Sequence, residues 1–191
     1  MGRNALRFGC LALLLYAMNS ASARAARAPG IEFAPAAPEF EPAAAEYRAI
    51  WADDGERIAQ VFKRRTGLQL APQPIRAIVF EGVSHSGYGS RPMRLRASLP
   101  SDTKRATLVH ELAHRLIAGP MPSRFEDHPV IFLFLYDVWV DLWGQDFADA
   151  QVAVESRRRG YDYAGAWRET LALSADERAR RWSEFLAQRR G

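Results

Sequence analysis

The strongest constraint on the fold of this chain is one apolar stretch that carries three polar side chains close together. Residues 107–118 read TLVHELAHRLIA, with His110, Glu111 and His114 set among Leu, Val, Ile and Ala. In an α-helix, residues four positions apart lie one turn apart on the same face, whereas neighbouring residues are rotated by about 100°. The apolar residues predict a buried helix, so the three polar side chains need a partner that offsets the cost of burying them.

A metal ion is the partner that this pattern indicates, because His-Glu-x-x-His on a helix is a known signature of zinc metalloproteases. His110 and His114 would each place one imidazole nitrogen on a single zinc ion. Glu111 would lie beside the metal and accept a proton from a zinc-bound water. The alternative is a pair of core histidines satisfied by Glu111 without a metal, but three buried polar groups are costly to satisfy in that way.

The rest of the sequence predicts a single α+β domain around this helix. A helical period over 43–65 predicts an N-terminal helix, and strict alternation over 93–99 predicts a strand with one apolar face. The other expected elements are a strand at 74–81 and helices at 101–118, 126–143, 146–159 and 163–171, with a last helix after the capping box at 174–177. We therefore expect an N-terminal helix, a small sheet, the active-site helix and a helical C-terminal part, all within 43–191.

The two N-terminal segments are predicted to lie outside that domain. Residues 1–23 have the features of a secretory signal peptide, with Arg3 and Arg7 before a short apolar run. Residues 24–42 are rich in Ala and Pro, which predicts a linker. We therefore expect an exported protein, in a bacterial periplasm or outside the cell, with no membrane span left after cleavage. Cleavage would also remove Cys10, the only cysteine, which excludes a Cys nucleophile and a Cys-ligated zinc site.

The charge gives little support for a polyanionic partner. The chain has 26 Lys and Arg against 22 Asp and Glu, a formal net charge of +4, and nearly all of its basic residues are Arg. We therefore expect a peptide or protein substrate and no nucleic acid. The Arg run at 157–159 is expected to be a solvated face.

The sequence resembles the zincin metallopeptidases on the residues of this motif. The resemblance implies that His110 and His114 bind zinc and that Glu111 is the general base. It also implies that a strand at the sheet edge, just before the active-site helix, aligns the peptide substrate, and the strand at 93–99 matches in place and character. Arg115 departs from the family pattern, in which an uncharged residue usually follows the second histidine.

The third zinc ligand is expected on the next helix. Catalytic zinc sites have three protein ligands and one open position. The gluzincin branch of the family has an acidic ligand on a second helix, followed four residues later by an Asp that orients a metal-binding histidine. Asp137 and Asp141 have this spacing in the apolar helix at 126–143, with Asp in place of Glu. We therefore expect Asp137 as third ligand and Asp141 as the orienting residue. The competing ligand is His128.

The function expected from these residues is that of an exported zinc-dependent metallopeptidase with one Zn²⁺ ion. Four residues are possible donors to the oxyanion of the reaction, although an ordinary structural role is the simpler interpretation of each: His85, Tyr88, Tyr161 and Tyr163. Two other functions remain open. One is a non-peptidase zinc hydrolase on the same scaffold, and the other is a non-catalytic zinc-holding binding protein. Glu111 favours catalysis, because a structural site needs no general base beside an open position.

Overall fold

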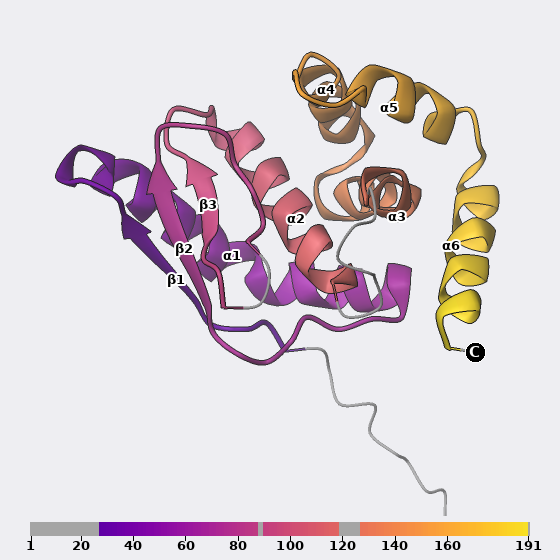
Figure 1. Cartoon of the computed structure of the whole chain (residues 1–191), viewed down its shortest axis with the longest axis horizontal. Coiled ribbons are helices and arrows are strands. Elements are labelled where there is room, and N and C mark those ends of the chain that lie inside the picture. The colour runs from indigo at the N-terminus through magenta and orange to yellow at the C-terminus, as the bar shows by residue number, and fades with distance from the viewer. Residues whose placement is uncertain (1–26, 88–89, 119–126, 191) are drawn as a thin grey trace, which may run out of the picture.

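The computed structural model describes residues 27–87, 90–118 and 127–190. The predicted signal peptide and Tyr88 lie outside the described residues. Within them the fold is mixed α/β and mostly helical (Figure 1). The strands are β1 (Ile31–Pro35), β2 (Ile75–Phe80) and β3 (Met93–Arg96). The helices are α1 (Glu41–Thr66), α2 (Ser101–Ile117), α3 (His128–Trp143), α4 (Gln145–Glu155), α5 (Tyr163–Leu171) and α6 (Ala175–Arg190), with one 3₁₀ turn at Pro38–Phe40.

The three strands form a small parallel sheet in the order β1-β2-β3. Alternate residues of β2 and β3 are buried, whereas in β1 only Phe33 is buried. The side chains of Ala77, Val79 and Leu95 are almost completely inaccessible to solvent. One face of the sheet is thus part of the core, which is the result expected from strands with a period of two. β3 lies at one edge of the sheet, beside α2.

The segment at 24–42, predicted as a linker, instead contains regular secondary structure. It contains β1, which pairs with β2, and the first turn of α1 begins at Glu41. The physical reason is Phe33, which is buried and whose ring stacks 6.0 Å from that of Tyr47. Proline blocks a helix but is tolerated at the end of an edge strand, so Pro35 does not prevent the pairing.

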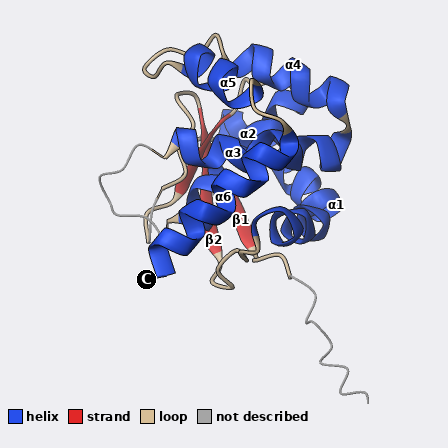
Figure 2. Cartoon of the chain, turned by 90° about the vertical axis from the view of Figure 1, so that its right-hand side faces the viewer, coloured by secondary structure: helices blue, strands red, loops and turns tan. Residues whose placement is uncertain are grey.

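Helix α3 lies at the centre of the helical part. It contacts α1, α2, α4, α5 and α6, and Figure 2 shows the helices gathered around it. Its sequence is apolar almost all the way round, which is typical of a helix covered on every side. No helix in the described ranges is long and apolar enough to cross a membrane. The packing of α2 against both β3 and α3 places the His-Glu-x-x-His motif between the sheet and the helical part.

Candidate metal centre

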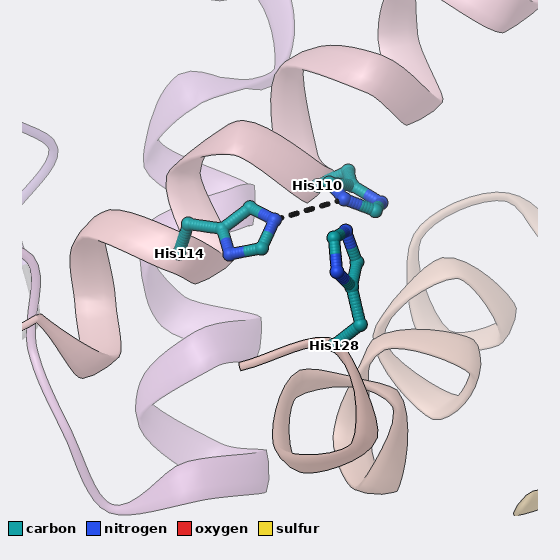
Figure 3. A group of neighbouring side chains, drawn as sticks. All are labelled: His110, His114 and His128. Carbon is teal, nitrogen blue, oxygen red and sulfur yellow. Dashed lines mark hydrogen bonds between the residues drawn. The ribbon is translucent and has the colours of Figure 1, made fainter. Parts of the chain in front are cut away.

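Three histidines from two helices converge at this place. His110 and His114 lie one turn apart on α2, and His128 is the first residue of α3 (Figure 3). One ring nitrogen from each residue lies within 4.8 Å of the other two. His110 and His114 are buried and His128 is half-buried. The cluster could therefore hold a metal ion.

The geometry between the two histidines of α2 fits a shared cation. Their Nε2 atoms are 3.0 Å apart. Two nitrogens on one tetrahedral zinc ion, each at 2.0–2.1 Å from it, would be roughly 3.3 Å apart. The separation of 3.0 Å is close to that value, so a small adjustment of the rings would admit the ion.

Two carboxylates contact these rings at Nδ1, the nitrogen that points away from the facing Nε2 atoms. Nδ1 of His110 lies 2.8 Å from Oε1 of Glu155, and Nδ1 of His114 donates a hydrogen bond to Oδ2 of Asp127 at 2.7 Å. Each carboxylate favours a proton on Nδ1, which leaves the lone pair of Nε2 for the cluster. Two Nε2 lone pairs that face each other require a proton or a metal between them, and this is the clearest sign that the site is built for a cation.

The pKa values of the two histidines move in opposite directions. Burial lowers the pKa of His110 to about 4, against a partial opposing effect of Glu155, so this ring is neutral at neutral pH. Burial also lowers the pKa of His114, but the hydrogen bond with Asp127 and the charge of Glu111 outweigh it and raise the pKa overall. The pair can thus share one proton in the absence of a metal, and a metal would displace that proton.

Glu111 lies on the same helix and is 4% exposed. Burial raises its pKa to about 7, against the opposing influence of His114 and Arg158. A carboxyl group with this pKa both accepts and releases a proton near neutral pH, which is the property of an efficient general base. Its side chain lines the same cleft as the three histidines.

Aromatic side chains fix the third histidine. The ring of Tyr161 stacks on that of His128 with centroids 4.6 Å apart. The hydroxyl of Tyr163 lies 3.1 Å from Nε2 of His128. Burial raises the pKa of Tyr163 to about 12, so its hydroxyl stays protonated and available as a donor. Both tyrosines were candidates from the sequence, and the structure brings both of them to His128.

The cluster opens into a cleft of about 490 Å³. This volume is within the range of about 300–1,000 Å³ that is usual for small-molecule and substrate sites. One wall is the loop that follows β2, and the turn between α4 and α5 supplies another part. The lining residues are Gly82, Val83, Ser84, His85, Ser86, Arg96, Leu99, His110, Glu111, His114, Asp127, His128, Arg158, Arg159 and Tyr163.

The loop at 82–87 also covers the outer edge of β3. His85 and Arg94 exchange two backbone hydrogen bonds of 2.9 Å in an antiparallel bridge, and the hydroxyl of Ser84 accepts a bond from the amide of Arg96. β3 is thus an edge strand of the sheet, as the resemblance to zincins implied, but its outer backbone groups at Arg94 and Arg96 are already paired. The segment that faces the cleft at this edge is the loop itself.

Arg115, which departs from the family pattern, anchors this loop. Its Nη1 donates to the carbonyl oxygens of Ser86, at 2.7 Å, and of Gly87. Gly87 has a φ of +57°, and a Cβ built there would lie 2.2 Å from the carbonyl oxygen of Pro92, so no other residue fits. The unusual charge after the second histidine therefore holds one wall of the cleft in place.

The structure does not bring the two predicted carboxylates of α3 to the histidines. Asp137 forms two hydrogen bonds with the guanidinium of Arg178, at 2.9 and 2.7 Å, and Asp141 pairs with Arg65. Asp137 lies nine positions after His128 on the helix, or about 13 Å further along the axis. The prediction that these carboxylates need partners is confirmed, but the partners are arginines of α6 and α1. The prediction of Asp137 as metal ligand and Asp141 as orienting residue therefore does not fit the structure, and the third member of the cluster that could hold a metal ion is His128.

Sequence reasoning missed the two carboxylates that do contact the histidines. Asp127 is adjacent to His128 and could have been found from that position. Glu155 carries no signal in the sequence, because a single Glu on a short amphipathic helix is usually exposed, whereas this one is 1% exposed. Only the packing of α4 against α2 reveals its role.

The chain was also compared with known proteins. No family model, no curated protein and no solved structure matches it.

The carboxylate behind His110 gives a first testable prediction. We expect Glu155→Gln to weaken zinc binding by about 10- to 100-fold, because the charge that favours the Nδ1–H form of His110 is removed while the shape is kept. Zinc affinity is measured by competition with a chromophoric chelator. Glu169→Gln, an exposed change on α5, is the control and should leave the affinity unchanged. Equal affinities for Glu155→Gln and the wild type would show that Glu155 does not orient His110.

Proposed function

We propose that the protein is a zinc-dependent hydrolase, and specifically a metallopeptidase, with His110, His114 and His128 as ligands of one zinc ion. The observation that carries this proposal is the combination of three converging histidines with a buried Glu111 on one open cleft. Three protein ligands leave one position of a tetrahedral ion open, which is the arrangement of catalytic rather than structural zinc sites.

Zinc is favoured by the donor set. Three imidazole nitrogens suit Zn²⁺, copper or nickel better than Mg²⁺ or Ca²⁺, which prefer oxygen ligands. When bound, zinc supplies a Lewis acid that polarises a carbonyl group and lowers the pKa of water to about 7. The remaining steps belong to side chains of this chain.

Glu111 is placed to move the proton. It is buried and lines the same cleft as the three histidines, where it would accept a proton from an attacking water and then return that proton to the amine that leaves. Among the candidate donors that the structure describes, Tyr163 is the one we assign to the oxyanion, because its hydroxyl lies 3.1 Å from Nε2 of His128 and the residue lines the cleft. These two roles are the acid–base and electrostatic parts of peptide hydrolysis.

The peptide substrate would lie along the loop at 82–86 rather than along β3. In an antiparallel bridge, residues on either side of a paired residue direct their backbone groups away from the partner strand. His85 is paired with Arg94, so the backbone groups of Ser84 are directed away from β3, at the wall of the cleft. An extended peptide could add to this segment in the manner of an extra strand.

Metal removal tests the proposed function directly. We expect the purified protein to contain about one zinc ion per chain and to cleave members of a mixed peptide library, with the cut bonds identified by mass spectrometry. Dialysis against a chelator should abolish cleavage, and added zinc should restore it. A metal-loaded protein that cleaves no peptide would contradict the peptidase and favour the non-catalytic alternative.

A further inference from the structure

The turn between α4 and α5 carries three consecutive arginines that the sequence assigns to a solvated face. In the structure, Arg158 and Arg159 line the same cleft as the histidines, whereas Arg157 is exposed and does not. A basic run therefore forms part of the wall of the candidate active site. The two arginines in that wall have different environments.

Arg158 is held by residues of the protein itself. Its Nη1 lies 3.1 Å from Oε1 of Glu155, and its Nη2 donates to the hydroxyl of Thr107 at 3.1 Å. The guanidinium also lies over the ring of Tyr163, 5.9 Å from its centroid. Arg158 is thus held between Thr107 and the Glu155 carboxylate that contacts His110.

Arg159 is exposed and makes no ion pair with any acidic residue in the described ranges. Two other charged groups at the cleft already have partners. Arg96 pairs with Glu81 at 2.6 Å, and Asp127 accepts from His114. The guanidinium of Arg159 is therefore available to bind a ligand in the cleft.

We propose that the cleft accepts peptides that carry a carboxylate beside the bond to be cut, and that Arg159 binds this carboxylate. This inference rests on the proposed function and names its substrate class. The planar fork of a guanidinium matches a carboxylate in two parallel hydrogen bonds. The cleft is much larger than a small anion, and Val83, 83% exposed, adds an apolar contact at its wall. Both features fit an acidic peptide better than a free anion.

The carboxylate can come from two sources, an acidic side chain or the C-terminus of the peptide. A pair of libraries separates them, one with free and one with amidated C-termini. If amidation removes the preference, Arg159 binds the terminal carboxylate. If Asp and Glu remain enriched in the amidated library, it binds the side chain.

The test compares four proteins on these libraries: the wild type, Arg159→Gln, Arg159→Glu and the control Arg157→Gln. Cleaved peptides are identified by mass spectrometry. Retention of uncleaved peptides is measured on the Glu111→Gln protein with and without Arg159→Gln. Among the peptides cleaved by the wild type and by Arg157→Gln, we expect carboxylates near the cut bond to be about fivefold more frequent than in the starting library. The enrichment should vanish in Arg159→Gln and turn toward Lys and Arg in Arg159→Glu.

The inference and the proposed function fail in different ways. Acidic peptides retained through Arg159, with no cleavage by any protein, would sustain the binding of carboxylates by Arg159 and contradict the peptidase. Cleavage with the same preference in Arg159→Gln as in the wild type would sustain the peptidase and overturn the inference. If Arg157→Gln lost the preference for carboxylates to the same extent, the inference would also be overturned. The preference would then come from the overall positive charge and not from Arg159.

Discussion

Replacing Glu111 by Gln is expected to abolish peptide hydrolysis while the zinc ion stays bound. The amide keeps the shape of the carboxyl group but cannot accept a proton, and loss of a general base typically lowers the rate by about 10²- to 10⁴-fold. In this variant the proposed ligands His110 and His114 keep their contacts with Glu155 and Asp127, so metal content should be unchanged. Cleavage of a library-derived fluorogenic peptide, measured beside zinc content, gives both results in one sample.

The stability of the same variant is an independent control. Burial raises the pKa of Glu111 from 4.5 to about 7, so the folded protein binds this proton more tightly than the unfolded chain does. The stability of the metal-free wild type should therefore fall, relative to Glu111→Gln, as the pH rises from about 4.5 through 7. A variant that is metal-loaded, well folded and fully active would contradict the role of Glu111 as base.

The sequence predicted the parts of the site that lie within one helix. His110, Glu111 and His114 are fixed relative to one another by helical geometry alone, and α2 begins and ends within one residue of the predicted range. The parallel sheet and its first strand were harder to predict, because β1 is short and lies in a Pro-rich segment that lacks a strong alternation. Its pairing with β2 depends on residues more than 40 positions away.

The partners of charged residues could not be predicted because they depend on how helices pack. The sequence indicated correctly that carboxylates on the apolar helix α3 need partners, but it could not distinguish a metal ion from the guanidinium of Arg178 on α6. The same limit hid Glu155, which reaches His110 from a helix that begins 35 residues further along the chain. Local spacing thus determines which residues share a face, and tertiary packing determines what that face meets.

His128→Ala and Asp137→Ala are expected to have opposite effects on metal binding and on folding. Without His128, zinc would have only two ligands, so its affinity should fall by more than the 10- to 100-fold that is typical of losing an orienting partner. Asp137→Ala should leave zinc affinity unchanged but destabilise the fold by up to about 3 kcal/mol, because the buried guanidinium of Arg178 loses its carboxylate. Zinc titration and denaturant unfolding of the two variants measure these effects.

A double variant separates a structural effect from a metal effect. Asp137→Ala with Arg178→Met removes the unpaired charge, so it should recover a substantial part of the lost stability while zinc affinity remains that of the wild type. Arg178 contacts none of the three histidines, and its other hydrogen bond is to the carbonyl of Leu173. If Asp137→Ala lost zinc in a folded protein while His128→Ala retained it, the acidic ligand of the gluzincin pattern would be correct and the three-histidine site would be wrong.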